Sequence, residues 1–270
     1  MYWRLGAAIT TVITSRQHPI VKAFRELAHG AGPSMLLDGW HLLTEAVAAD
    51  IAIETVAWCG PPTTAEQITL ERAQRGGAQV IEVSGSVLNA ISPVNAPTGV
   101  VASAKKPRVD PLAVLQPAPA LILAGVAIQD PGNAGAVVRA AAAAGATGVV
   151  VDEATANPWG WKALRASMGA VFLVPVSRPR TIVPALAGWR AAGVSIVAAV
   201  ARGGTPMYDV DLRKPTALLL GGEGAGLPAS LVSSADTQIS IPMRDAVESL
   251  NVAVAAALLL YEARRQRHVR

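Results

Sequence analysis

Short apolar runs alternate with helical patterns over the second half of the chain. The runs are rich in β-branched residues, as expected for parallel strands that are covered on both faces. They lie at 120–127, 147–151, 171–176, 194–200, 216–220 and 238–241. Helical spacing of apolar residues falls between them, as at 133–144 and 181–192, and a last helix is expected at 249–266. This order predicts a doubly wound α/β sheet.

The first half of the chain predicts a smaller α/β layer domain. Helices are expected at 18–27, 40–49, 64–76 and from Ser86, and strands at 34–38, 53–58, 79–83 and 99–103. Residues 103–119 hold four prolines together with Lys105, Lys106 and Arg108, a composition typical of a linker. We therefore expect one domain at 12–103, a linker at 104–118 and a second domain at 119–270.

Composition narrows the class of protein. Apolar residues make up 51% of the 270 residues, which is enough for a large core. No apolar run approaches the roughly 20 residues that cross a bilayer. Met1 to Thr11 also lacks the apolar stretch of a signal peptide, so we expect a cytoplasmic protein. The one cysteine, Cys59, forms no internal disulfide and is expected to be buried and inert.

The basic residues are unevenly distributed along the chain. Up to Asp110 there are nine basic and nine acidic residues, whereas from Pro111 onward there are fourteen basic and ten acidic ones. Of the 23 basic residues 18 are arginine, the side chain that suits bidentate phosphate contacts. A GC-rich genome, which favours arginine codons, is an equally good explanation of the number of arginines.

The first segment with candidate chemistry is residues 129–139, which follow a predicted strand and open a helix. Asn133 is expected to cap that helix. Arg139 lies almost two turns further along, on a face that is otherwise nearly all alanine and valine. A single arginine on such a face is commonly a surface residue whose aliphatic stem covers its apolar neighbours.

The second segment, residues 218–228, places four glycines around Glu223 at the end of a buried strand. In open α/β sheets this edge binds ligands, and four glycines exceed what a turn requires. The segment carries neither the dinucleotide fingerprint nor the Gly-Lys-Ser/Thr of a P-loop. The third segment, residues 239–252, ends a strand at Pro242 and starts a helix near Ser249, which alone is an ordinary connection with Ser249 as a cap.

Together the segments resemble the three signature motifs of the SpoU family of RNA ribose methyltransferases. Residues 133–139 are similar to N-x-G-x-x-x-R, residues 221–227 to G-x-E-G-x-G-L, and residues 241–252 to I-P-M…S-L-N-V. Residues 165–170 resemble the family's R-x-S-x-G-A segment. Further pieces resemble the ribosomal-protein-like RNA-binding module that is often attached to these enzymes, and they lie at 15–22, 37–43 and 97–100.

The chain departs from the family pattern at three positions. Asp245 stands where glycine is usual, Ala253 where serine is frequent, and Asp38 where glutamate is usual. None of them is assigned to the chemistry. A carboxylate at Asp245 is expected to affect the loop near the cofactor.

The resemblance implies an α/β-knot fold with a deep trefoil knot, S-adenosylmethionine as the cofactor, and no metal. The implied cofactor-binding residues are Leu220, Gly221, Gly222, Ile241, Met243 and Leu250. The implied catalytic residues are Arg139 with Asn133, Glu223, Ser249 and Asn251 in support. Arginine has a pKa above about 12 and is a poor base, so we expect Arg139 to hold a phosphate or to polarise the ribose oxygen.

The resemblance also implies partners, namely RNA and a second copy of the chain. The expected RNA-binding residues are Arg16, Lys22, Arg165, Arg264 and Arg265. The basic tail at 264–270 fits equally well a helix end that favours cations. Apolar residues of the last helix fit either a homodimer interface or the core of one chain, and they include Leu250, Val254, Ala257, Leu258 and Tyr261.

The substrate class follows from the resemblance alone. Ribosomal RNA, and large-subunit rRNA in particular, is expected because the N-terminal module resembles the one attached to rRNA-specific members. A tRNA methyltransferase of the same family, an enzyme of drug resistance and a non-catalytic RNA-binding protein are alternatives. A nucleotide-dependent dehydrogenase is disfavoured by the missing fingerprint.

Overall fold

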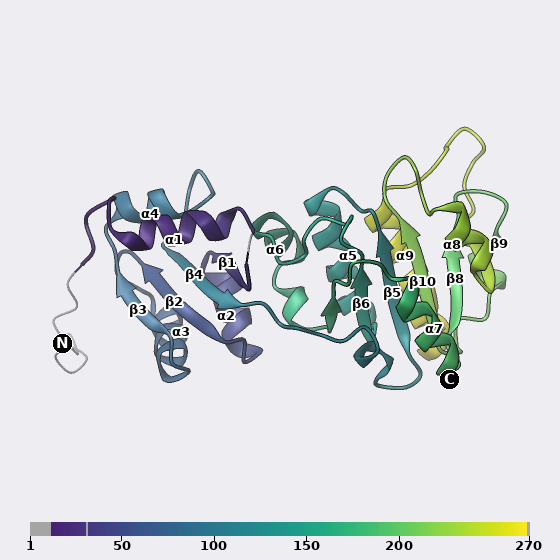
Figure 1. Ribbon diagram of the computed structural model, residues 1–270, viewed down its shortest axis with the longest axis horizontal. Helices are drawn as coiled ribbons and strands as arrows, with labels where there is room; N and C mark the ends of the chain where they lie inside the picture. Colours follow the sequence, from purple (N-terminus) through teal and green to yellow (C-terminus); the bar gives the residue numbers. More distant parts are fainter. Residues whose placement is uncertain (1–11, 31, 269–270) are drawn as a thin grey trace. The chain divides into compact units, whose positions relative to one another are not determined.

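The computed structural model describes residues 12–30 and 32–268 (Figure 1). The chain divides into two compact units between Lys106 and Pro107. The expectations for Met1 to Thr11 and for the end of the basic tail at 269–270 lie outside the described residues. Within the described part of the chain, none of the helices has the length and apolar character needed to cross a membrane.

The first unit is a mixed four-stranded sheet covered by helices. Its strands lie in the order β1-β4-β2-β3, with β4 antiparallel to both of its neighbours and β3 parallel to β2. The strands are β1 (Ser34–Asp38), β2 (Ile53–Trp58), β3 (Gln79–Glu82) and β4 (Val100–Lys105). The helices are α1 (Pro19–Ala28), α2 (Trp40–Ala48), α3 (Thr64–Arg75) and α4 (Gly85–Ile91). Figure 1 shows α1 beside α4, and α2 and α3 on the other side of the sheet.

Local signals account for two of these helices. α3 begins with a capping box, in which the Thr63 hydroxyl accepts from the Glu66 amide and the Glu66 carboxylate accepts from the Thr63 amide. α1 begins with Pro19 behind His18, whose Nδ1 accepts from the Ile20 amide.

The second unit is a parallel sheet of seven strands in the order β7-β6-β5-β10-β8-β11-β9. The strands are β5 (Leu121–Val126), β6 (Gly148–Val151), β7 (Val176–Ser177), β8 (Ser195–Ala199), β9 (Thr205–Pro206), β10 (Thr216–Gly221) and β11 (Thr237–Ser240). The α-helices are α5 (Pro131–Ala144), α6 (Trp161–Ser167), α7 (Val183–Ala191), α8 (Ala229–Ser234) and α9 (Val252–His268). Short 3-10 turns lie at η1 (Ala113–Leu115), η2 (Ala170–Phe172) and η3 (Met207–Asp209).

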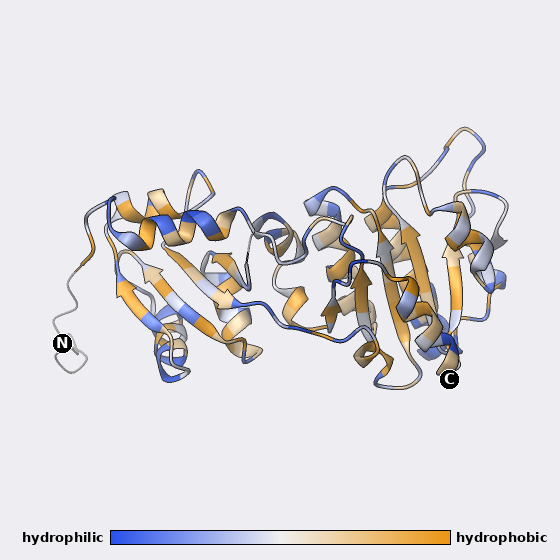
Figure 2. Ribbon diagram, in the orientation of Figure 1, coloured by the Kyte–Doolittle hydropathy of each residue, from blue (hydrophilic) through white to orange (hydrophobic). Residues whose placement is uncertain are grey.

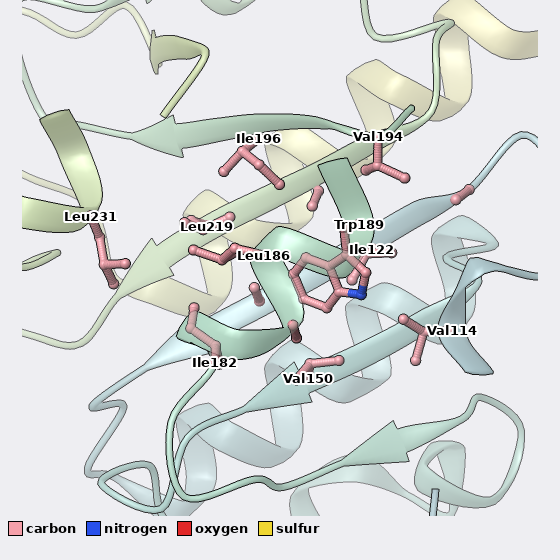
Figure 3. Close-up of a cluster of buried hydrophobic side chains, with 14 of the residues drawn as sticks. Val114, Ile122, Val150, Ile182, Leu186, Trp189, Val194, Ile196, Leu219 and Leu231 are labelled. Atoms are coloured by element: carbon pink, nitrogen blue, oxygen red, sulfur yellow. The ribbon is translucent and has the colours of Figure 1, made fainter. Parts of the chain in front are cut away.

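The core of this unit lies on both faces of the sheet. Figure 3 shows Trp189 of α7 among Ile122, Leu219 and other buried apolar side chains on one face. The Trp189 indole donates to the Pro111 carbonyl at 3.0 Å, so its polar atom is satisfied. Successive strand residues point to opposite faces, and Leu121 and Leu123 are buried as well. The central strands are therefore apolar along their length, as Figure 2 shows.

Several sequence expectations need correction. The strand expected at 171–176 is instead the turn η2 followed by the two-residue β7, because Gly169 has a positive φ and Pro175 has no amide hydrogen to donate. α6 and α8 lie between predicted strands, where helices were expected but without stated bounds. β4 extends to Lys105, into the region that was expected to be a linker. Cys59 is partly exposed instead of buried.

Candidate active site

The three motif segments meet at one edge of the parallel sheet. They follow β5, β10 and β11 and therefore start at the carboxyl ends of these strands. In open parallel sheets this edge binds ligands. The remaining question is which side chains the three loops bring into contact.

The start of α5 is capped by Asp130. Its Oδ1 accepts from the Asn133 amide at 2.7 Å, and Pro131 occupies the first helical position. The expectation that Asn133 caps this helix is therefore wrong. Asn133 is the third residue of α5, which leaves its side-chain amide available to the other two segments.

Asn133 joins all three segments through its side chain. Its Nδ2 donates to Glu223 Oε1 from the glycine loop, and its Oδ1 accepts from Asn251 Nδ2 at 3.0 Å. A carboxylate only accepts hydrogen bonds, so Glu223 fixes which end of the Asn133 amide faces which partner. The Asn133 amide has both the donor that Glu223 requires and an acceptor for Asn251. Glu223, Asn133 and Asn251 thus form one hydrogen-bonded chain, which we call the carboxamide chain.

Asn251 also caps the last helix. Its Oδ1 accepts from the Ala253 amide at 2.9 Å and from the Val254 amide at 3.3 Å, and α9 begins at Val252. The interpretation of Ser249 as the cap is therefore wrong. Ser249 lies exposed in the loop, two residues before Asn251 and outside the carboxamide chain.

The glycine loop closes tightly upon itself and upon the turn after β5. The Gly222 amide donates to the Val126 carbonyl at 2.8 Å, and Gly222 pairs with Gly226 in an antiparallel bridge. A Cβ atom on Gly222 would lie 1.9 Å from the Ala127 carbonyl oxygen, and one on Gly221 would lie 2.0 Å from the Gly226 carbonyl carbon. Gly224 and Gly226 have positive φ angles of 83° and 64°. Close packing therefore requires the first two glycines, and backbone conformation favours the other two.

The residues expected to bind the cofactor lie in the glycine loop and in the loop from β11 to α9, both at the carboxyl edge of the sheet. Leu220 is buried at the end of β10, next to Gly221 and Gly222. Ile241, Met243 and Leu250 lie partly exposed in the loop from β11 to α9. These side chains are apolar and the neighbouring backbone is neutral, which suits a flat base and an aliphatic chain.

Arg202, which follows β8, holds the loop between β11 and α9. Its Nη2 donates to the carbonyls of Asp245 at 2.7 Å and Val247 at 3.2 Å. The exposed Asp245 carboxylate forms an ion pair with Arg202 at 3.6 Å. The carboxylate that replaces the usual glycine at position 245 therefore points into solvent and needs no space inside the protein. The sequence expectation did not include Arg202.

Arg139 lies apart from the carboxamide chain, exposed on α5. It is six residues beyond Asn133, about 9 Å along the helix axis. It lines a groove of about 490 Å³ between α5, α6 and α9. The other lining residues are small or apolar, namely Ala136, Ala140, Ala143, Ala166, Ala253, Val254, Ala257, Leu258 and Tyr261. Val254, Leu258 and Tyr261 are exposed on this face.

The first unit carries a basic groove beside α1. It has a volume of about 310 Å³ and contains Arg16 and Lys22, both expected to bind RNA. His18, Arg25 and His29, which the sequence expectation did not include, line the same groove. Their spacing along one helix, together with Lys22, is the signal that would have revealed them. In the second unit, Arg165 is exposed in the last turn of α6.

The arginines at the end of α9 bind groups of the protein itself. Arg264 donates to the Ala144 carbonyl at the end of α5 at 3.4 Å, and Arg265 makes two bonds of 2.8 Å to Glu262. The Arg265 guanidinium lowers the pKa of the Glu262 carboxyl. RNA binding by Arg264 and Arg265 stays a prediction.

Arg267 is the most engaged of these side chains. It donates to four carbonyls, those of Pro119, Ala120, Leu212 and Lys214, at 2.7–3.0 Å. Partial burial lowers the pKa of Arg267. These carbonyls precede β5 and β10, so the end of α9 is fixed at the amino edge of the sheet, opposite the three motif segments.

Comparison with known proteins defines the class. Residues 120–261 match the model of the SpoU rRNA Methylase family, and residues 31–102 match an MRM3-like substrate binding domain. The chain therefore belongs to the SpoU rRNA methylase family.

Characterised relatives and solved structures resemble the chain over most of its length. The chain is 30% identical over 231 residues to the 23S rRNA (guanosine(2553)-2′-O)-methyltransferase RlmP of Bacillus subtilis, covering 86% of this chain and 88% of that one. The AdoMet-bound rRNA methyltransferase from Sinorhizobium meliloti superimposes with a TM-score of 0.85 at 30% identity, covering 94% and 97%. The SpoU methyltransferase AviRb from Streptomyces viridochromogenes, in complex with AdoMet, gives 0.82 at 28%, covering 91% and 97%.

Proposed function

We propose that this protein transfers a methyl group from S-adenosylmethionine to a ribose 2′-hydroxyl of ribosomal RNA, most specifically of the large subunit. The observation that carries the proposal is the carboxamide chain, which joins all three motif segments beside the glycine loop. The likeness to RlmP supports the 2′-hydroxyl and the large-subunit RNA, and the AdoMet-bound relatives support the cofactor.

The residues at the carboxyl edge fit S-adenosylmethionine. Gly221 is partly exposed and is proposed to offer its main-chain groups to the adenine, with apolar surface from Ile241, Met243 and Leu250. Gly222 is buried, with its amide bonded to Val126 and its carbonyl to Gly226, and Leu220 is buried beside it, so these two are proposed to shape the site from below. When bound, the cofactor supplies a reactive methyl group on a positively charged sulfur. The tight closure of the glycine loop keeps these contacts in one arrangement, which favours in-line transfer.

Arg139 is proposed to grip an RNA phosphate or to polarise the ribose oxygen. Its guanidinium is exposed in a groove with apolar walls, where it is accessible for a charge-assisted, bidentate bond to a phosphate. Asn133, Glu223 and Asn251 hold the two loops on either side of the substrate, and Ser249 is proposed to support them from the loop before α9. Arg16, Lys22 and Arg165 are proposed to bind the RNA backbone, with Arg264 and Arg265 as more distant contacts.

The same proposal includes four further properties. They are a division into segments 12–103, 104–118 and 119–270, a homodimer, a deep trefoil knot and a cytoplasmic location. The apolar groove beside Arg139 and the exposed Leu258 support the dimer. The knot is supported by two features, the position of β10 between β5 and β8 and the hydrogen bond by which Asn251, after β11, returns to Asn133.

Light scattering of Leu258→Arg tests the dimer, because a charge in this groove is expected to yield a monomer.

A methyl-transfer assay tests the function. Tritiated S-adenosylmethionine is added with rRNA or tRNA from a strain that lacks the gene, and the product is hydrolysed with alkali. Because a 2′-O-methyl group blocks cleavage at its own phosphodiester, label is expected in an alkali-resistant dinucleotide from rRNA. Label in mononucleotides would refute 2′-O transfer, and label from tRNA alone would refute the rRNA assignment.

Arg139→Ala is expected to abolish transfer and to leave cofactor binding largely intact. Arg213→Ala is the matched control, because Arg213 is also exposed but pairs with Asp211 near the amino edge. Full activity in Arg139→Ala would remove Arg139 from the mechanism.

A further inference from the structure

The segment after β6 supports the turn that follows β5. Asp152 Oδ1 accepts from the Ala127 amide at 3.0 Å, and Thr155 Oγ1 accepts from the Ile128 amide at 3.2 Å. The Thr155 hydroxyl donates in turn to Asp152 Oδ1 at 2.8 Å. Both Thr155 and Ile128 are almost fully buried. Two side chains from another loop therefore satisfy the successive amides of this turn.

The supported turn leads into the first motif segment, and the second motif segment packs against it. Ala127 has φ 53°, which is unfavourable for a residue with a Cβ atom and needs support from its surroundings. A Cβ atom on Gly222 would lie 1.9 Å from the Ala127 carbonyl oxygen, and the Val126 carbonyl accepts a hydrogen bond from the Gly222 amide. The glycine loop thus closes against this turn.

The loop that contains Asp152 and Thr155 is held in turn by Arg178, which follows β7. Its Nη2 donates to the carbonyls of Glu153 at 2.7 Å and Thr155 at 2.9 Å. Its Nε is buried and has no hydrogen-bond partner within the described part of the chain. A partly buried guanidinium that donates to two carbonyls of one loop restricts that loop.

We propose that Thr155 and Asp152 are positioning residues for the cofactor site. They act through the backbone of Ala127 and Ile128, against which the glycine loop is set, and they do not touch the reacting atoms. The inference rests on the proposed function, because it names the structure that shapes the same site. None of the three sequence motifs contains either residue.

The decisive comparison is Thr155→Val against Thr147→Val. Thr147 makes the same kind of bonds at the amino edge, where its Oγ1 accepts from the Leu121 amide at 3.2 Å and donates to the Val114 carbonyl at 2.6 Å. It is also buried, so each substitution removes the side-chain acceptor of one buried backbone amide, that of Ile128 or that of Leu121. Both variants are expected to lower the melting temperature, but only Thr155→Val displaces the turn beside Gly222.

Calorimetry with S-adenosylmethionine measures the effect. Loss of one buried hydrogen bond from the supporting turn is expected to raise Kd about tenfold in Thr155→Val. Thr147→Val is expected to stay within about twofold of the wild type, and Thr155→Ser, which keeps the hydroxyl, is expected to restore binding. Equal Kd values in Thr155→Val and the wild type would overturn the proposal, as would equal weakening in the two valine variants.

Amide hydrogen exchange without any cofactor provides a second readout. Exchange at Ile128 and Gly222 is expected to accelerate in Thr155→Val and to be unchanged in Thr147→Val. Unchanged exchange at Gly222 in Thr155→Val would contradict the positioning role. If the wild-type protein bound no S-adenosylmethionine, the proposed function would fail, while this exchange measurement would still decide whether Thr155 orders the turn.

Discussion

Replacing Gly222 by alanine tests whether the glycine loop needs space or only conformational freedom. The added Cβ atom would lie 1.9 Å from the Ala127 carbonyl oxygen and 2.7 Å from its carbon, whereas such contacts below 3.0 Å are essentially never seen. The backbone must therefore move by about 1 Å. Gly224 provides the control, because a Cβ atom there meets nothing within 4 Å, although its φ is 83°.

The two substitutions are expected to lower the free energy of unfolding by different amounts. Overpacking of a tight site costs about 1–3 kcal/mol, and weakening the Gly222–Val126 hydrogen bond adds about 1 kcal/mol. Gly222→Ala is therefore expected to lose about 2–4 kcal/mol, and Gly224→Ala about 1 kcal/mol from its left-handed conformation. At about 2–4 °C per kcal/mol for a domain of this size, Tm falls by about 5–15 °C for the first and about 2–4 °C for the second.

Thermal unfolding and calorimetry with S-adenosylmethionine measure both effects on the same samples. Gly222→Ala is also expected to weaken cofactor binding at least about tenfold, because the displaced turn lies beside the proposed cofactor site. Gly224→Ala is expected to bind within about threefold of the wild type. If both variants melted within 2 °C (about 0.5–1 kcal/mol) of each other, the argument from close packing at Gly222 would be refuted.

Three other substitutions test the remaining contacts. Asn133→Asp places a carboxylate against Glu223 and is expected to slow methyl transfer at least about a hundredfold in single-turnover assays, with cofactor Kd within about threefold. Arg267→Ala removes the donor to four carbonyls and is expected to lower the urea-derived unfolding free energy by about 2–3 kcal/mol, without changing RNA affinity. Arg265 lowers the folded-state pKa of Glu262 below 4.5, so its contribution is complete above about pH 4.5 and is lost as pH falls through the folded-state pKa. In the wild type the urea midpoint of unfolding is therefore expected to fall as the pH is lowered from 6 to 3, and Glu262→Gln is expected to reduce this fall. An equal fall in the variant would contradict the role of the Glu262–Arg265 pair.

The central strands of the parallel sheet were predictable because they are buried on both faces, whereas the short exposed strand β9 was not predicted. β5, β8 and β10 lie within one or two residues of the apolar runs that predicted them. The failure at 171–176 has the same origin, because Ala170 and Val171 are buried in a turn as fully as strand residues are. An apolar run predicts that a segment is buried, but burial alone does not distinguish a strand from a packed turn.

The motif residues were found from the sequence, but the contacts among them were not. Asp130 and Asn133 are equally good capping residues, and only the proline at position 131 selects Asp130 as the cap. That signal was present in the sequence. The bonds from Asn133 to Glu223 and Asn251 join residues 90 and 118 positions apart, and no local rule predicts them. Thr155 was missed for the same reason, since its partner is a backbone amide 27 residues away.

The distribution of charge along the chain is a poor guide to the RNA surface, and the fold explains why. Part of the basic excess of the second half lies on Arg264, Arg265 and Arg267, which bind carbonyls and Glu262 at the amino edge of the sheet. The six residues of β5 separate that edge from the carboxamide chain by about 20 Å. Arg139, the residue proposed to contact the RNA, lies instead on α5, about 9 Å along the helix axis from Asn133 of the carboxamide chain. The cations of α9 serve mainly to fix the last helix, whose first turn is capped by Asn251 of the same chain of hydrogen bonds.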